Sequence, residues 1–183
     1  MWLTVLEKMR IPDYAQHQLL WTYFPQVSKS EGAERPFCYL DTGDKIMMLS
    51  VVEPSTECIK IEFQAGQTLM FNCMASLTAR RYSKSGVVFK PQDYTAEHTK
   101  DWFIRKFKDV ADINYVTFKK HAPHMLVDST GRKKRIPLDR TEFFGTLTIV
   151  DPERFVEIVG RGIGGGCAFG FGAMILPQVM KWK

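Results

Sequence analysis

The chain has 183 residues, of which 45% are hydrophobic and 13% aromatic, so it is globular rather than disordered and can form one domain or two small ones. No apolar run reaches the length of about 20 residues that a membrane span requires, and charges occur by position 7, so we expect neither a membrane anchor nor a signal peptide. The four cysteines are widely spaced and form no C-x-x-C pair, which argues against a zinc knuckle and is typical of reduced thiols in a cytoplasmic protein.

The net charge of +5 is unevenly distributed along the sequence. Residues 1–75 carry 6 Lys or Arg and 9 Asp or Glu, a net charge of −3, whereas residues 76–183 carry 19 and 11, a net charge of +8. A basic second half favours a polyanionic partner such as a nucleic acid, although a solvated basic surface would have the same composition.

The first half of the sequence predicts one helix among several strands. Asp13 is a good cap for a helix that continues to about Tyr23, and Pro25 ends it. Strands are expected at residues 1–9, on both sides of a turn at 42–44, at 59–63 and at 68–77. This order is close to a ferredoxin-like plan in which the second helix is reduced.

The second half begins with a basic crossing segment at residues 78–92 and predicts two helices and three strands. Thr95 can cap the first helix, and Asp151 followed by Pro152 opens the second. The strands are expected at 113–127, at 135–150 and after the glycine-rich segment that starts at 162. We therefore predict an α+β fold of two tandem ferredoxin-like (RRM-like) domains, the first at residues 1–78 and the second at 79–183.

His17 is a candidate for proton transfer, because imidazole titrates near neutral pH and can act as a general acid or base. On a helix it shares one face with Tyr14, three residues before it, and Trp21, four residues after it. A lone histidine on such a helix more often has a structural role. The other three histidines are scattered and no acidic cluster has ligand spacing, so we expect no metal or other cofactor.

Residues 160–172 hold seven glycines in thirteen positions. Such a loop lets backbone N–H groups approach a phosphate closely, and Gly164, Gly165 and Gly166 are the candidates for this contact. The segment lacks the G-K-[ST] end of a Walker loop and follows a helix rather than a strand, which is the wrong context for a dinucleotide fingerprint. The alternative is a flexible turn that tight packing requires.

Cations of the second half are candidates for contacts with a nucleic-acid backbone, which needs distributed positive charge with aromatic side chains nearby for stacking. They lie in the crossing segment and at the tip of the hairpin: Arg80, Arg81, Lys84, Arg132, Lys133, Lys134 and Arg135. Tyr82 and Phe118 are the candidate stacking residues, although either could instead belong to the core. A solvated turn would tolerate the same charges at the tip.

Taken together, these segments resemble the CasE branch of the CRISPR repeat-processing endoribonucleases. "YAQHQLLWTYFP", residues 14–25, resembles that family's Y-x-x-H-Q-x-L-W-x-x-F-P helix. "GIGGGCAFGFGAMIL", residues 162–176, resembles its C-terminal glycine-rich loop and the strand that follows. The order between the two motifs also fits, and the resemblance spans nearly the whole chain.

The resemblance implies two ferredoxin-like domains and metal-independent cleavage of CRISPR precursor RNA at the base of a repeat stem-loop. It implies that His17 is the catalytic histidine and Tyr14 its partner. The ribose 2′-OH would attack the adjacent phosphate and leave a 2′,3′-cyclic phosphate. The product would stay bound, so that the protein becomes a subunit of a CRISPR effector complex, and its partners would be this RNA and the other subunits.

One position departs from the family pattern. Members of the family often carry a basic residue in the glycine-rich loop, where this chain has Gly165, Gly166 and Cys167. Another cation, either Arg161 or a lysine of the basic half, would then have to stabilise the charge that develops on the phosphate. Two other functions stay open at this stage: a catalytically inactive RNA-binding subunit of the same fold, and a protein-interaction adaptor.

Overall fold

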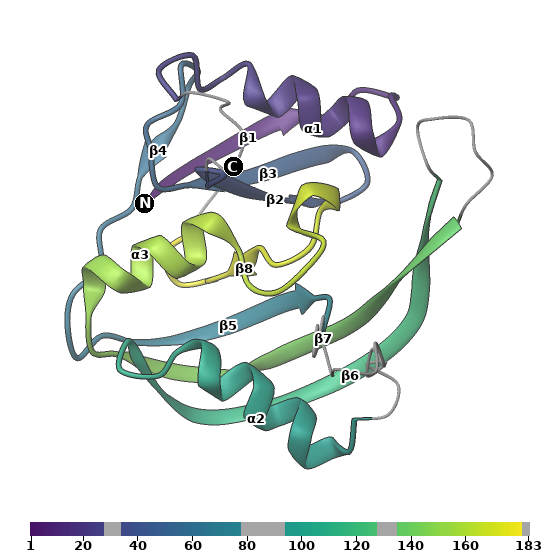
Figure 1. The fold of residues 1–183 in the computed structure, drawn as a ribbon. Helices are drawn as coiled ribbons and strands as arrows, with labels where there is room; N and C mark the ends of the chain where they lie inside the picture. Colours follow the sequence, from purple (N-terminus) through teal and green to yellow (C-terminus); the bar gives the residue numbers. More distant parts are fainter. Residues whose placement is uncertain (28–33, 78–93, 128–134, 181–183) are drawn as a thin grey trace.

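The computed structural model describes residues 1–27, 34–77, 94–127 and 135–180 (Figure 1). These residues form two four-stranded antiparallel sheets with helices packed against them, an α+β fold. The predicted fold class, two tandem ferredoxin-like units, is confirmed. In the part of the chain that the structure describes, no helix is both long and apolar enough to cross a membrane.

The first sheet has the strand order β2-β3-β1-β4 and one helix, α1. Its elements are β1 (Trp2–Glu7), α1 (Asp13–Trp21), β2 (Phe37–Asp41), β3 (Lys45–Ser50) and β4 (Ile59–Lys60). Each of these elements was predicted from the sequence. The helix begins at Asp13 and its N-cap position is Pro12, so Asp13 is the first helical residue rather than the N-cap that we predicted.

Both faces of this first sheet are buried. Along β3, Ile46 and Met48 point to a cluster that α1 completes with Leu20 and Phe24. The alternate residue Leu49 points to the other face, into the main core. A strand with apolar side chains on both faces produces the continuous hydrophobic run seen in the sequence.

The second sheet has the order β6-β7-β5-β8 and contains a complete β-α-β-β-α-β unit. Its elements are β5 (Thr68–Ala75), α2 (Ala96–Lys106), β6 (Ala111–Val127), β7 (Arg135–Ile149), α3 (Pro152–Arg161) and β8 (Met174–Ile175). The caps predicted for the two helices are confirmed, because the side chains of Thr95 and Asp151 accept hydrogen bonds from the amides of His98 and Arg154.

Strand β5 corrects one part of the sequence prediction. We expected the strand at 68–77 to close the first sheet, but it pairs with β7 along its whole length and with β8 on its other side. It is therefore the first strand of the second unit, for which the sequence had predicted only three strands. The short β4 occupies the position in the first sheet that had been assigned to β5.

Helix α3 joins the two units into one core (Figure 1). A side chain at Gly160 would come within 3.1 Å of the backbone at Ser50 and Val51, so this helix lies directly against the end of β3. On the same helix the ring of Phe155 lies 5.1 Å from Phe63 and 6.3 Å from Phe107, which follows α2. The main hydrophobic cluster accordingly contains buried residues from both sheets.

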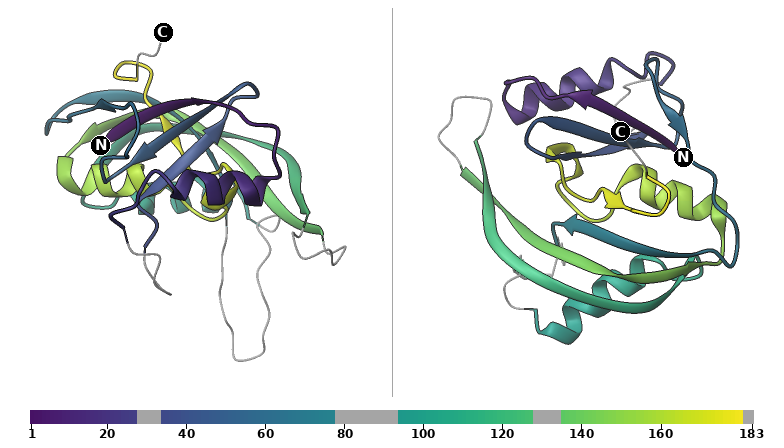
Figure 2. Two further views of the ribbon diagram at one scale, coloured as in Figure 1. Left: turned by 90° about the horizontal axis from the view of Figure 1, so that it is seen from above. Right: turned by 180° about the vertical axis from the view of Figure 1, so that it is seen from behind.

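Strands β6 and β7 form a long curved hairpin that extends beyond the rest of the second sheet (Figure 2). Its distal half reaches the glycine-rich segment, where the ring of His124 lies 6.0 Å from Phe171. In its proximal half a β-bulge between Ile113 and Tyr115 shifts the register. A Cβ at Gly145 would clash with the carbonyl oxygen of Tyr115, so the bulge requires glycine at this position of β7.

We expect Gly145→Ala to lower the free energy of unfolding by about 1–3 kcal/mol, because the added methyl group forces β6 away from β7 at the bulge. Chemical denaturation measures the change. Thr146→Ser, the next position in the same strand, is the matched control and should change stability by less than about 0.5 kcal/mol. Equal stability of Gly145→Ala and the wild type would contradict this account of the bulge.

Candidate functional site

His17 lies on α1 at the edge of an aromatic cluster. Its ring centroid is 5.8 Å from that of Phe37 and 6.4 Å from that of Trp21. Phe37 comes from β2 and is itself fully buried, stacked on Phe24 at 5.2 Å. The imidazole is therefore held against a rigid apolar surface rather than extended into solvent.

A hydrogen bond defines the state of this imidazole. Nε1 of Trp21, one helical turn later, donates to Nε2 of His17 at 3.2 Å. An indole N–H can only donate, so Nε2 carries a lone pair, and in the neutral ring the proton is on Nδ1. The Nδ1 atom is shielded from solvent. The geometry thus orients Nε2 as a hydrogen-bond acceptor, which can take up a proton once the Trp21 N–H moves away.

Tyr14 lies in the first turn of α1, three residues before His17. Its side chain is outside what the structure describes, so its pairing with His17 stays a prediction. Sequence reasoning placed Trp21 on this helix face, but it gave no role to Phe37. No local pattern could have indicated Phe37, because it reaches the site only through the pairing of β2 with β3.

The glycine-rich segment lies beside α1. Its short 3-10 helix, Cys167–Phe169, contacts both α1 and β2, and the hydroxyl of Tyr39 donates to the carbonyl of Ala168 at 3.0 Å. Gly166 precedes this turn in the left-handed conformation, with φ 71°, which favours glycine. The fold therefore brings together the helix and the loop that the two sequence motifs identified (Figure 1).

Part of the loop's hydrogen-bonding capacity is used within the protein. The amide of Gly165 donates to the carbonyl of Ser76 at 3.0 Å, and that of Gly172 donates to Met74 at 2.7 Å. Gly165 is therefore a poor candidate for binding phosphate through its N–H. The amides of Gly164 and Gly166 have no acceptor among the described residues and stay candidates.

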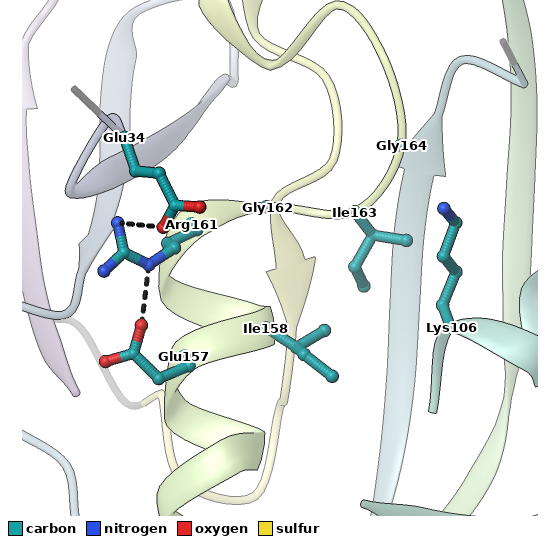
Figure 3. A pocket seen from close by; sticks show the side chains of 8 residues that line it. All are labelled: Glu34, Lys106, Glu157, Ile158, Arg161, Gly162, Ile163 and Gly164. Carbon is teal, nitrogen blue, oxygen red and sulfur yellow. Dashed lines mark hydrogen bonds and ion pairs between the residues drawn. The ribbon is translucent and has the colours of Figure 1, made fainter. Parts of the chain in front are cut away.

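Arg161 ends α3 and is bound by two carboxylates (Figure 3). Its Nε lies 2.6 Å from Glu157, and a terminal nitrogen lies 3.3 Å from Glu34. The same guanidinium donates to the carbonyl of Arg35 at 3.3 Å. Its charge is thus balanced by protein groups, which compete with any phosphate.

Arg161 borders a pocket of about 510 Å³. Lys106 of α2 lies across this pocket (Figure 3). Its ammonium is 5.2 Å from the ring of Trp102, a cation–π contact, and no carboxylate pairs with it in the described part of the chain. Of the cations around residues 162–164, Lys106 is the one whose charge the described residues leave unbalanced.

The other predicted cations cannot be placed. Arg80, Arg81, Lys84, Arg132, Lys133 and Lys134 lie outside the described residues, and Arg135 opens β7 with a side chain that is not described. Of the two predicted stacking residues, Tyr82 also lies outside the described residues. Phe118 points to the core side of β6, where its ring lies 6.1 Å from Phe143, so the core position that we had kept as its alternative is the one the structure shows.

A polar network that the sequence did not indicate links three strands of the second sheet. Glu142 of β7 accepts a hydrogen bond from Asn72 of β5 at 2.9 Å, and its other oxygen lies 2.9 Å from Nε2 of His121 on β6. The hydrogen bond from Asn72 lowers the pKa of Glu142, and the contact with His121 adds to this effect against the opposing cost of burial. In the described ranges, no group of three or more His, Cys, Asp or Glu could hold a metal ion.

Comparison with known proteins identifies the family. The family model described as CRISPR associated protein matches residues 7–177. The chain belongs to this CRISPR-associated family, which confirms the family resemblance predicted from the sequence. A search of curated proteins gives no match.

Solved structures share the fold of this family member at low sequence identity. The chain is 22% identical to Cas6e from Escherichia coli K-12, with 96% of this chain and 98% of that one covered and a TM-score of 0.68. A CRISPR endoribonuclease Cse3 bound to a 19-nucleotide RNA is 21% identical, with 96% and 99% covered and a TM-score of 0.73. A chain of a CRISPR RNA-guided surveillance complex is 15% identical, with 96% and 98% covered and a TM-score of 0.69.

Substituting Trp21 tests the state of His17. In Trp21→Phe the ring packing against Phe37 is kept but the N–H donor is lost, so Nε2 of His17 is no longer fixed as an acceptor. We expect ¹⁵N NMR of the wild type above neutral pH to show the proton on Nδ1, and the variant to show a mixture of both tautomers. The same single tautomer in both proteins would mean that Trp21 does not select it.

Acid should weaken the contribution of Glu142 to the stability of the fold. Because its pKa is lowered in the folded state, the carboxylate stabilises the fold above its ordinary pKa of 4.5, and this stabilisation is lost as the pH falls through the lower folded value. We expect wild type to be more stable than Glu142→Gln at pH 6, with the difference shrinking below pH 4.5. Thermal melts at both pH values measure this, and a difference that does not depend on pH would contradict it.

Proposed function

We propose that this protein is a metal-independent endoribonuclease that cuts CRISPR precursor RNA at the base of the repeat stem-loop. The observation that carries the proposal is the imidazole of His17, whose Nε2 accepts a hydrogen bond from Trp21 and which is held on α1 beside the glycine-rich loop of a CRISPR-associated protein. The similarity in fold to an endoribonuclease bound to RNA, over 96% of this chain, supports the same substrate class.

The proposed reaction is an internal transfer of the phosphoryl group. The ribose 2′-OH loses its proton and attacks the adjacent phosphorus, the bond to the 5′-oxygen breaks, and that oxygen takes up a proton. The products are a 2′,3′-cyclic phosphate and a 5′-hydroxyl. His17 either removes the first proton through the lone pair on Nε2 or, once protonated, delivers the second, and Tyr14 aligns the imidazole or the phosphate.

Substrate binding must release Nε2 from Trp21 for either role. A 2′-OH or a phosphate oxygen that approaches Nε2 would replace the indole N–H at 3.2 Å as its hydrogen-bond partner. The amides of Gly164 and Gly166 then offer donors to the phosphate, because both are left over after the loop's own hydrogen bonds are made.

The stem of the RNA is held by the basic second half in this proposal. RNA helices are recognised mainly by shape and backbone, which suits distributed cations at the crossing segment and the hairpin tip. These cations are the seven predicted from the sequence: Arg80, Arg81, Lys84, Arg132, Lys133, Lys134 and Arg135. Gly165 and Arg161 contribute less than expected, because Gly165 already donates to Ser76, and Arg161 must exchange a carboxylate for a phosphate.

We further propose that the cleaved RNA stays bound and that the protein joins other subunits of a CRISPR effector complex. Its fold is shared with a chain of an RNA-guided surveillance complex over 96% of its length. Cleavage followed by retention demands only a few turnovers, so a catalytic contribution limited to proton transfer is sufficient.

A second function is favoured by the same hydrogen bond. If the Trp21 N–H stays on Nε2 when RNA binds, His17 is a structural residue and the protein is an inactive RNA-binding subunit. The RNA-binding surfaces are unchanged in this case, so only an assay of cleavage separates the two functions.

We expect His17→Ala to slow cleavage of the organism's own CRISPR repeat RNA by at least about 100-fold, because general acid–base catalysis by one side chain is worth about 10² to 10⁴. The assay is run in EDTA, and the product is examined for a 2′,3′-cyclic phosphate. Binding of the uncleaved RNA should be unchanged.

His98→Ala is the matched control, because His98 is an exposed histidine on α2, and it should keep wild-type activity. Tight binding without cleavage in wild type and variant alike would contradict the nuclease and leave the inactive subunit. RNA binding that is weak, indifferent to sequence and lost in moderate salt would instead favour a protein adaptor.

A further inference from the structure

The second sheet buries only one of its faces. Along β5, Leu69 and Phe71 point into the core, while Met70 between them is 52% exposed. Tyr115 of β6 is on the same outer face and is 61% exposed. Both lie opposite Thr146 of β7, so the three side chains form one row across the sheet.

The exposure of Tyr115 depends on a specific backbone feature. The bulge before it shifts the register of β6, so that Tyr115 rather than Asn114 pairs with Thr146. Bulges of this kind redirect side chains, and this one is possible only because Gly145 leaves room for the Tyr115 carbonyl. The next row holds a second aromatic ring, the half-buried Phe144, paired with Asn72 and Thr117.

The charge of this outer face changes along the strands. The exposed carboxylate of Asp112 is at the end near α3, where it pairs with Thr148. Toward the hairpin tip, the face presents Lys119 and then Arg140. Glu142, which lies opposite Lys119, is engaged by Asn72 and His121. Beyond the two aromatic rows the face therefore becomes basic.

We infer that this outer face, defined by Met70, Tyr115, Phe144 and Lys119, is a stacking platform for unpaired nucleotides next to the RNA stem-loop. Bases stack on exposed aromatic rings of a sheet whatever their sequence, and cations beside the rings hold the backbone. A protein partner fits less well, because Thr146, Asn72 and Thr117 interrupt the apolar side chains and prevent a continuous hydrophobic patch.

The inference rests on the proposed function, since it concerns RNA that flanks the same stem-loop. The platform lies on the side of the second sheet away from its buried core, so it adds a contact that is separate from His17 and from the glycine-rich loop. It also gives the protein a means of holding the single strand that remains attached to the stem.

The test compares three RNAs that carry a 2′-deoxy substitution at the cleavage site, so that binding is measured without reaction. One is the stem-loop alone, and the others carry an unpaired extension on the 5′ or the 3′ side. We expect one of the two extensions to tighten binding, as measured by fluorescence anisotropy. Tyr115→Ala should then weaken the affinity for that extended RNA by about tenfold, as expected for the loss of one stacked base. The affinity for the stem-loop alone should not change.

Matched variants separate stacking from a loss of structure. Tyr115→Phe keeps the aromatic face and should bind like wild type, and Ile104→Ala, an exposed apolar residue on α2, should have no effect. In the wild-type protein, 4-thiouridine in the extension should crosslink to the peptide that contains Tyr115. This measurement needs no substitution and is therefore independent of any folding defect in a variant.

Several outcomes would overturn the inference. If neither extension tightens binding, or if Tyr115→Ala binds the extended RNA like wild type, no stacking occurs and the face is left to a protein partner. An equal loss on all three RNAs would indicate a folding defect, and the absence of the crosslink would then decide against the platform. If the wild type binds none of the RNAs, the proposed function fails as well.

Discussion

The contact between α3 and the first sheet is the constraint on which the rest of the structure depends. Gly160 allows the helix to lie directly on the backbone at Ser50 and Val51, and Phe155 on the same helix packs against both halves of the chain. The glycine-rich loop follows α3 immediately, so the position of this helix decides where the loop goes. The loop reaches α1, and therefore His17, only because α3 is fixed to the first sheet.

This dependence explains why the proposed site combines residues from both units. His17 and Trp21 are supplied by the first, and Gly164 and Gly166 by the second. Between them, β2 supplies Phe37 under the imidazole and Tyr39, which binds the carbonyl of Ala168. A change that loosened α3 would separate the imidazole from the loop without altering either sequence motif.

Local chemistry made much of the fold predictable. The starts of α2 and α3 followed from Thr95, Asp151 and Pro152, because capping acts within one helical turn. The assignment of β5 failed because strand pairing is not local, and an apolar strand between two units suits either sheet equally well. The prediction of Asp13 as the N-cap of α1 failed because Pro12, with its fixed φ, already holds the chain in the conformation that precedes a helix.

The sequence motifs identified residues of the candidate site, but they did not predict how these residues are arranged in space. His17 and the glycine-rich segment could be identified by residue type, whereas the hydrogen bond from Trp21 and the use of the Gly165 amide depend on the folded backbone. Phe118 and Tyr115 show the same limit. Simple alternation gives no reason to prefer one ring over the other, and the bulge at Asn114 decides which of them faces solvent.

The absence of a cation from residues 165–167 has a consequence for the chemistry. Arg161 cannot replace it at low cost, because removing Glu157 or Glu34 from the guanidinium would leave a carboxylate unpaired next to the incoming phosphate. In the proposed reaction, the charge that develops on the phosphate would then be stabilised by the amides of Gly164 and Gly166 and by Lys106, whose ammonium borders the same pocket without a carboxylate partner among the described residues. Because the amides carry no net charge and Lys106 lies across the pocket from Arg161, cleavage would depend on how the bound stem-loop places its phosphate between them.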